Sequence, residues 1–388
     1  MKEKRGSKKA VIIAVLITFF ATVGGIFLAL WLALGTGGLA VLEGIFLVNT
    51  RFVGPMDRQT VADSALTGMV KGLGDRWSYY LDPDWYQSEL LRRENVYVGV
   101  GITVTYDHEE GLYIKEVAPD GPAEAAGVLP GEILTAVDGV STAGEGRDDA
   151  VARIKGARGT TVALTLLSAD GSSRTVTVTR GAVKESPVRC ELLEDGVGYV
   201  KLENFNSRSA EDFKAAVDAL LEQGASALVF DVRNNGGGYV DELTDMLDYL
   251  LPEGPVFRMR SRSGREKVFT SDAAHVDLPM AVLVNADSYS AAEIFAGELR
   301  EAGAAVVVGV ETSGKGYAQI TYPVLGGGAL GISTYEYVTG GGVSLVGTGV
   351  TLDADVDLDE ERAALLKADA LPHGEDAQLS AALELLGK

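Results

Sequence analysis

An uncharged run of 25 residues near the N-terminus, residues 10–34, constrains this chain more than any other feature. It reads AVIIAVLITFFATVGGIFLALWLAL, and an apolar segment of this length spans a bilayer as a tilted helix. The apolar stretch of a secretory signal is usually shorter, about 7–15 residues, so an uncleaved anchor is the favoured interpretation. Five of the nine preceding residues are Lys or Arg. This predicts a single-pass protein of the cell membrane, with residues 1–9 as a cytoplasmic tail and everything after the anchor extracytoplasmic.

Composition narrows the functional classes. The chain of 388 residues has a formal net charge of −21, which disfavours binding to nucleic acid or to an anionic surface. A single cysteine, Cys190, excludes an intrachain disulfide and a cysteine-rich metal site. His108, His275 and His373 are widely separated and lack metal-ligand spacing, so we expect neither a metal nor a cofactor.

The chain after the anchor divides into three segments. Residues 36–95 are predicted to be mainly helical, with Asp57 as a helix cap. Residues 96–182 contain short β-rich runs between glycine turns, and residues 186–388 alternate strands with helices. We therefore expect a mixed α/β fold: a transmembrane helix, a helical cap, a β-rich domain and a core of repeated βα units. Functional loops are expected at the strand ends of that core.

The β-rich segment resembles a PDZ domain. The sequences GxGI, AxxAG, LPGEILTAVDG and IKGxxGTTVxL follow one another in the PDZ order. PDZ domains bind an extended C-terminus as an added strand, and amides of a glycine loop hold its carboxylate. The alternative is a small β-rich domain without a ligand. The resemblance implies that the peptide-binding residues are Val98, Gly99, Val100, Gly101 and Ile102.

A lysine-containing loop, GVETSGKG (309–316), fits most of a phosphate-binding pattern. That pattern requires Ser or Thr after Lys315, where this chain has Gly316, and a helix that faces the phosphates. The following sequence, YAQITYPVL, is typical of a strand instead. We therefore do not expect nucleotide binding, and Lys315 needs another role.

Two further loops follow predicted strands. In VLVNADSYSAAEIFAGEL, Ser290 lies between a strand and a helix, where an acyl-transfer nucleophile is usually presented. The other interpretation is that Ser290 only caps the helix. In ALVFDVRNNGGGYV, the glycines at 236–238 supply amides for an oxyanion or form a simple flexible turn.

Together the three loops resemble those of the C-terminal processing peptidases, the tail-specific serine proteases. The family carries D-x-R-x-N-x-G-G, then V-N-x-x-S-A-S-A-S-E-I-x-A-G, then G-x-x-T-x-G-K-G-x-x-Q. This chain has DVRNNGGG, VNADSYSAAEIFAG and GVETSGKGYAQ, so Tyr289 and Ala292 replace an alanine and the last serine of the second motif. The resemblance implies a nucleophile, a general base, an accompanying glutamine and three oxyanion-binding amides, which are Ser290, Lys315, Gln319, Gly236, Gly237 and Ala291.

A Ser–Lys dyad works only when its lysine is neutral. The lysine pKa must therefore fall from about 10.4 towards about 7–8, chiefly through desolvation. We expect a dry pocket around Lys315 without nearby carboxylates, and Glu311 should point away from it. Gln319 is expected to orient the lysine or the substrate backbone.

The sequence thus predicts a membrane-anchored serine endopeptidase that cleaves exported proteins near apolar C-termini, with the PDZ segment selecting or gating the tails. One alternative is an inactive scaffold that binds C-terminal tails, but the presence of Ser290, Lys315 and Gln319 together argues against it. Another is a hydrolase of small acyl or thioester substrates, which would not need a PDZ domain. A homo-oligomer and an activating protein partner both stay open.

Overall fold

The computed structural model describes residues 3–144 and 147–388. The chain divides into two compact units, and the boundary in the sequence falls between Ala62 and Asp63. The first unit contains α1 (Glu3–Arg51) and the beginning of α2 (Arg58–Lys71).

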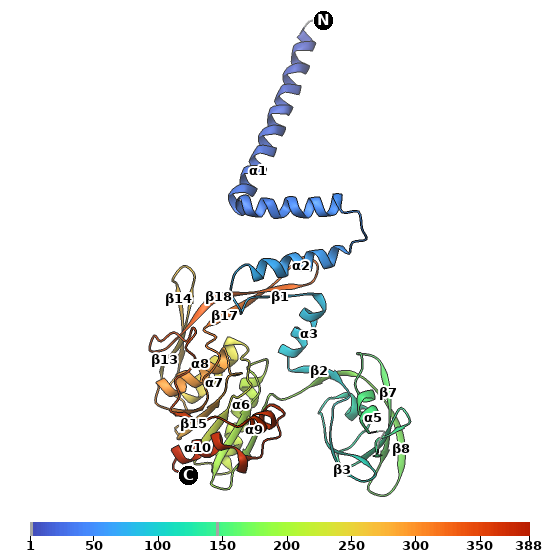
Figure 1. The fold of residues 1–388 in the computed structure, drawn as a ribbon, viewed down its shortest axis with the longest axis vertical. Helices are drawn as coiled ribbons and strands as arrows, with labels where there is room; N and C mark the ends of the chain where they lie inside the picture. The colour runs from blue at the N-terminus through green and yellow to red at the C-terminus, as the bar shows by residue number, and fades with distance from the viewer. Residues whose placement is uncertain (1–2, 145–146) are drawn as a thin grey trace. The chain divides into compact units, whose positions relative to one another are not determined.

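Two features of the first unit follow from local sequence. Gly35 interrupts α1 with a φ of 65° and a ψ of −174°, and the helix turns sharply there (Figure 1). Asp57 caps α2 as predicted, because its side chain accepts a 2.7 Å hydrogen bond from the Thr60 amide.

The anchor predicted at residues 10–34 lies inside α1. In the described part of the chain, Lys9–Arg51 is the one helical stretch long and apolar enough to cross a membrane. Its large apolar side chains are exposed, Phe20 for example at 67%. A membrane anchor and a signal sequence both have these properties. Of the predicted basic tail, residues 1–2 lie outside the described residues.

The second unit begins with the rest of the helical segment. β1 (Tyr79–Leu81) and α3 (Pro83–Arg93) follow α2, so this region is mainly helical as predicted except for one short strand. Asp82 starts α3 by accepting a hydrogen bond from the Trp85 amide, and Pro83 occupies the first helical position, where its missing amide costs nothing.

Residues 96–184 form two antiparallel sheets, as their alternating apolar pattern predicts. β2 (Val96–Gly99) pairs with β9 (Gly181–Lys184), so the chain enters and leaves this region through one two-stranded ribbon. The larger sheet has the order β3-β4-β5-β7-β8, with β6 beside β5, and its core includes the fully buried Leu112, Leu134 and Leu164. Its elements are β3 (Ile102–His108), β4 (Gly111–Val117), α4 (Pro122–Ala125), β5 (Ile133–Val137), β6 (Val140–Ser141), α5 (Arg147–Ile154), β7 (Thr161–Leu167) and β8 (Ser173–Thr179).

The C-terminal half is built on a sheet with the order β10-β11-β12-β15-β16-β19, in which only the pair β10–β11 is antiparallel among the described strands. The strands are β10 (Val188–Leu192), β11 (Val197–Leu202), β12 (Ala227–Asp231), β15 (Met280–Val284), β16 (Ala305–Gly309) and β19 (Ala354–Asp355). The helices are α6 (Ser209–Glu222), α7 (Val240–Leu250), α8 (Ala291–Glu301), α9 (Glu360–Lys367), η2 (His373–Glu375) and α10 (Ala377–Leu385).

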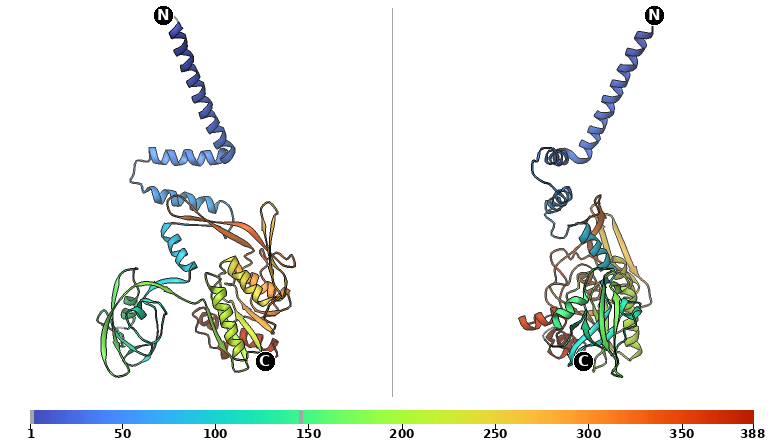
Figure 2. Two further views of the ribbon diagram at one scale, coloured as in Figure 1. Left: turned by 180° about the vertical axis from the view of Figure 1, so that it is seen from behind. Right: turned by 90° about the vertical axis from the view of Figure 1, so that its right-hand side faces the viewer.

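Alternate residues of the central strands point to opposite faces of this sheet. Leu228 and Phe230 pack in one buried cluster with residues of α6, α7 and α8. Ala227 and Val229 pack in another with Leu379 of α10. Both faces are thus covered by helices (Figure 2), which explains why the strands read as continuous apolar runs.

The C-terminal half also contributes to a separate antiparallel sheet. It was only partly predicted, since the sequence pattern indicated β17 but not the strands around it. Its order is β1-β18-β13-β14, and β17 pairs with β18. The remaining strands are β13 (Gly254–Ser261), β14 (Glu266–Ser271), β17 (Tyr317–Pro323) and β18 (Ala329–Thr339). The mixed α/β class is confirmed, but the core is not made of βα units alone.

Candidate active site

Three loops meet at one edge of the main sheet because they follow neighbouring parallel strands. β12, β15 and β16 lie side by side and end at Asp231, Val284 and Gly309. Gly309 has a φ of 143°, and a Cβ there would collide with the Val284 carbonyl oxygen. A glycine is therefore needed for the close approach of the loops that carry Ser290 and Lys315.

Ser290 lies at the N-terminus of α8 in a strained backbone conformation. Its φ of 62° and ψ of −120° differ from the extended conformation usual at helix caps, and only 7% of the residue is exposed. Strain of this kind is typical of a nucleophile on a strand-to-helix turn, whereas a plain cap does not need it. The backbone therefore favours the nucleophile interpretation.

Glu293, one turn into α8, binds both the serine turn and the lysine loop. Its Oε2 accepts hydrogen bonds from the amides of Ser290 at 3.0 Å and Lys315 at 2.9 Å. Its Oε1 accepts from the Gly314 amide at 2.8 Å and the Thr312 hydroxyl at 2.6 Å. The side chain is fully buried. One carboxylate thus fixes the relative positions of the two backbones, a role that the sequence analysis missed although the S-E-I motif contains this glutamate.

The Lys315 ammonium lies over two aromatic rings. Its Nζ is 5.0 Å from the centre of the Trp77 ring and 5.2 Å from that of Tyr289. Burial, followed by the nearby positive charge of Arg93, lowers the pKa of Lys315 to about 8, although Glu293 and Asp75 oppose the shift. A base with this pKa is partly neutral near neutral pH, as a proton acceptor needs to be.

The expectation of a pocket without carboxylates was wrong. Glu293 is buried next to Lys315, and Asp75 also acts on it. The pKa still falls because burial of the amine outweighs both acids. Glu311, the one acid anticipated as a problem, is exposed.

The predicted oxyanion-binding amides differ in availability. The Gly237 amide donates a 2.8 Å hydrogen bond to Asn235 Oδ1, so it is already occupied. In the part of the chain that the structure describes, the amides of Gly236 and Ala291 have no acceptor. Gly237 is still required next to the nucleophile, since a Cβ there would lie 2.9 Å from both Ser290 Cβ and the Ala291 nitrogen.

Gln319 forms its side-chain hydrogen bonds with β17 and β18, and none to Lys315 is found among the described residues. Its Nε2 donates to the Tyr317 carbonyl at 2.9 Å and to Ser333 Oγ at 3.0 Å. Tyr337, which the sequence did not single out, is buried beside Ser290. Burial raises the pKa of Tyr337 to about 12, and hydrogen bonding to the Ser290 hydroxyl opposes the rise.

These residues line one cavity of about 770 Å³. Ser290, Lys315 and Gln319 all face it, together with the glycines at 236–238. Trp77 and α3, with Arg92 and Arg93, also line the cavity. The cavity thus brings together side chains from distant parts of the sequence, and its volume is large enough to hold a peptide segment.

The predicted peptide-binding residues lie where β2 passes into β3. Val98 and Gly99 end β2, and Ile102 begins β3 at the edge position of its sheet order. Val100 and Gly101 connect the two strands, and Gly101 has a φ of 81°. A glycine turn followed by an edge strand is the arrangement to which PDZ ligands add.

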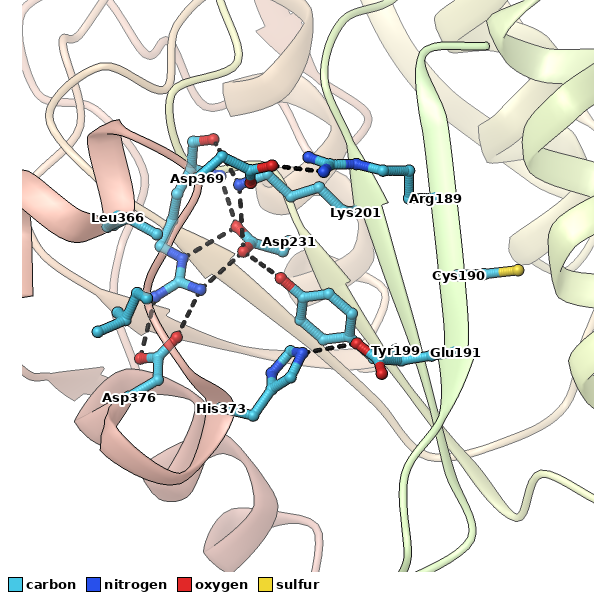
Figure 3. Close-up of a pocket in the computed structure, with 12 residues that line it drawn as sticks. Arg189, Cys190, Glu191, Tyr199, Lys201, Asp231, Leu366, Asp369, His373 and Asp376 are labelled. Carbon is cyan, nitrogen blue, oxygen red and sulfur yellow. Dashed lines mark hydrogen bonds and ion pairs between the residues drawn. The ribbon is translucent and has the colours of Figure 1, made fainter. Parts of the chain in front are cut away.

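A second polar cluster surrounds a smaller cavity, lined by residues of β10, β11, β12 and the segment 366–376 (Figure 3). The buried Arg233 guanidinium binds Asp231 and Asp376, with distances of 2.7 Å from Nη2 to each carboxylate. Lys201 and Tyr199 also contact Asp231, at 3.3 Å and 2.6 Å. Burial would raise the pKa of Asp231, but Arg233 and Lys201 hold it well below its usual range.

Comparison with known proteins decides the family. Residues 196–356 match peptidase family S41, and residues 87–167 match the PDZ domain. A carboxyl-terminal-processing protease from Synechocystis is 30% identical over 339 residues, covering 86% of this chain and 78% of its own length. The chain belongs to the carboxyl-terminal-processing protease family.

Two further proteins are similar to this chain. The chloroplastic carboxyl-terminal-processing peptidase 2 of Arabidopsis thaliana is 30% identical over 315 residues, but this chain spans only 61% of its length. An S41 protease structure from Bacteroides fragilis shares the fold, with a TM-score of 0.53, at 18% identity over 87% of this chain and 92% of that one. The family resemblance and the mixed α/β fold with a PDZ domain, both expected from the sequence, are confirmed.

Proposed function

We propose that this protein is a membrane-anchored serine endopeptidase that cleaves exported proteins near their C-termini through Ser290 and Lys315. The observation that carries the proposal is the meeting of a strained serine with a half-buried lysine of lowered pKa in one cavity.

The reaction would begin with neutral Lys315, which accepts the proton of the Ser290 hydroxyl as its oxygen attacks the peptide carbonyl. The amides of Gly236 and Ala291 would hold the resulting oxyanion. The lysine ammonium then gives its proton to the leaving amine, and water, deprotonated by the same lysine, releases the acyl group from Ser290. Within the described residues Lys315 Nζ makes no hydrogen bond to Ser290, so the pair has to close when substrate binds.

The PDZ domain would capture an apolar C-terminal tail at Val98–Ile102 and either deliver it to the cavity or control access to it. We assign it to residues 96–182, between the helical segment 36–95 and the peptidase core 186–388. The segment 10–34 would hold the catalytic part at the outer face of the cell membrane. A protein isolated from membranes should then have an N-terminal sequence that begins before residue 10, whereas a cleaved signal would leave one that begins after residue 34.

The catalytic proposal is tested with the full-length protein in detergent and an unfolded protein substrate that ends in apolar residues. Ser290→Ala and Lys315→Ala should each reduce cleavage by roughly 1,000-fold or more. Ser263→Ala and Lys367→Ala, at exposed positions, serve as matched controls. The rate of the parent should rise with pH through about 8, where Lys315 loses its proton.

Two outcomes would contradict the proposal. Full activity of Lys315→Arg would exclude a neutral base, because a guanidinium stays charged throughout this pH range. Tight binding of tail peptides without cleavage by the parent would instead identify the inactive scaffold.

A further inference from the structure

Tyr289, directly before the nucleophile, differs from the alanine of the resembling family motif, and its ring contacts the proposed base. The rings of Tyr289 and Trp77 lie 5.8 Å apart with an interplanar angle of 33°. Lys315 Nζ is within 5.2 Å of both ring centres. These separations are inside the range of about 6 Å in which a cation is attracted to a ring face.

We propose that Trp77 and Tyr289 are positioning residues that hold the terminal nitrogen of Lys315 between two aromatic rings and keep water away from it. The inference rests on the proposed role of Lys315 as the base for Ser290. It goes beyond that role by assigning the placement of the base to two aromatic side chains from separate loops.

Each ring is held in place by contacts to the loops that it serves. The Tyr289 amide donates to the Asn235 carbonyl at 3.1 Å, and its hydroxyl lies against Gly236, where a Cβ would be 2.6 Å away. Tyr289 is thus fixed between the oxyanion loop and Lys315. The ring and the nucleophile Ser290 therefore belong to one turn.

Trp77 is tied to the lysine loop through the residue before it. The Arg76 guanidinium lies 4.3 Å from the centre of the Trp77 ring and donates a 2.6 Å hydrogen bond to the Ser313 carbonyl. The Trp77 amide donates to Asp75 Oδ1 at 3.0 Å. The turn that carries Trp77 is therefore hydrogen-bonded to the lysine loop at Ser313, two residues before Lys315.

Two aromatic rings suit a base that changes charge during the reaction. They exclude water, which favours the neutral amine before attack. Their faces also attract the ammonium that forms after proton transfer, which limits the cost of burying it. The other charged groups that act on Lys315 are Arg93, which favours the neutral form, and Glu293 and Asp75, which favour the charged form.

The test measures the protonation of Lys315 directly and compares it with activity. Full-length Ser290→Ala protein is labelled with a trace amine-reactive reagent between about pH 6 and 11, and modification of Lys315 is followed by mass spectrometry. The same background carries Tyr289→Ala, Tyr289→Phe or Trp77→Leu. Tyr322→Ala, an exposed tyrosine on β17, is the matched control.

Removing the Tyr289 ring should admit water and move the labelling midpoint of Lys315 to higher pH by about one unit. Tyr289→Phe should keep the parent midpoint because the ring remains. Trp77→Leu keeps an apolar surface without a ring face, so its midpoint should move to lower pH. With Ser290 restored, the pH profile of kcat/KM should shift with the labelling midpoint, and Tyr289→Ala should lose about tenfold in rate at neutral pH.

An unchanged labelling midpoint in both Tyr289→Ala and Trp77→Leu would overturn the inference. The proposed function is judged separately by whether Ser290→Ala abolishes cleavage. Labelling does not depend on catalysis, so it still decides the role of the two rings if the enzyme proposal fails. A midpoint shift in Tyr289→Phe as large as in Tyr289→Ala would also contradict the role of the rings, because the Tyr289 hydroxyl alone would then cause the shift.

Discussion

Asp231 and Glu293 are both buried carboxylates beside the loops of the active site, but they bind different kinds of donor. Asp231 is bound mainly by side chains, among them the Lys201 ammonium (Figure 3) and the Arg233 guanidinium, and by one backbone amide, that of Arg233. Glu293 accepts hydrogen bonds from three backbone amides and one hydroxyl, and it has no ion-pair partner within the described residues.

This difference indicates two different jobs. Arg233 connects the end of β12 to Asp376, which caps α10, so the side-chain cluster joins segments that are distant in sequence. Backbone amides reach one carboxylate only when their loops follow a particular path. We infer that the Asp231 cluster chiefly stabilises the fold, whereas Glu293 chiefly sets the geometry of the site.

Arg233→Met tests the side-chain cluster and should have the largest effect on stability. It leaves two carboxylates buried without their shared cation, which typically costs about 3–5 kcal/mol. Urea denaturation measures the loss. Arg189→Met is the control, because Arg189 pairs with Asp369 and Glu203 at the exposed rim of the same cavity and should cost less than about 1 kcal/mol. Equal losses in the two variants would show that the buried Asp231 cluster stabilises the fold no more than an exposed ion pair does.

Glu293→Gln tests the backbone cluster and should affect activity more than stability. An amide group offers one acceptor oxygen in place of two, so the donors to one oxygen lose their partner, at a total cost of roughly 1–3 kcal/mol. The serine turn and lysine loop should separate, and kcat should fall by about 100-fold or more. Peptide cleavage and thermal unfolding are measured together. A variant that is destabilised but keeps the parent kcat in its folded fraction would argue against a geometric role.

Lys315→Met tests whether the lysine lowers the free energy of unfolding. The pKa of Lys315 is lowered to about 8 in the folded protein from 10.5, so the unfolded chain binds more protons between these pH values. The parent should therefore gain stability as the pH rises from about 8 to 10.5, and the variant should lack this slope. At pH 7 the variant should be more stable by about 1–2 kcal/mol, with no cleavage activity. Lower stability of the variant at pH 7 would refute the idea that the partly desolvated ammonium of Lys315 destabilises the fold.

Glu298→Gln is expected to have the smallest effect and the opposite sign to Glu293→Gln. Burial raises the pKa of Glu298 to about 8, against the hydrogen bond from the Gly340 amide, and the charge of Glu301 adds to the rise. The folded protein thus binds more protons than the unfolded chain from about pH 4.5 to 8, and it loses stability across this window. Glutamine keeps an oxygen for Gly340 and removes the ionisation, so stability at pH 8 should rise by about 1 kcal/mol. Denaturation of parent and variant at pH 5 and pH 8 measures this difference. If Glu298 does not titrate, the stability of the variant will change with pH as much as that of the parent.

Much of the site could be predicted from the sequence because it depends on chain order. Parallel strands bring their carboxyl ends to one edge, so loops after three apolar runs were expected to meet, and Ser290 and Lys315 do line one cavity. The family motifs added which residue types in those loops matter.

The rest of the site depends on packing between distant segments, which spacing does not reveal. Trp77 reaches Lys315 from a turn before the PDZ domain, and nothing in the sequence around either residue indicates that contact. Glu293 looked like an ordinary first-turn helix residue, and the occupied Gly237 amide depends on the orientation of the Asn235 side chain. The hairpin of β13 and β14 was detectable, since its two strands flank the SGR turn, but the stronger apolar patterns of α7 before it and β15 after it dominated.

The ribbon of β2 and β9 has a consequence for how this protein can be rebuilt. Val96 pairs with Lys184 and Gly99 with Gly181, so the PDZ domain is an insertion whose entry and exit are adjacent. A turn of two residues is enough to join paired antiparallel strands. The PDZ domain can therefore be replaced by another recognition domain, or by a short hairpin turn, because the two ends of the peptidase chain that must be joined are already adjacent.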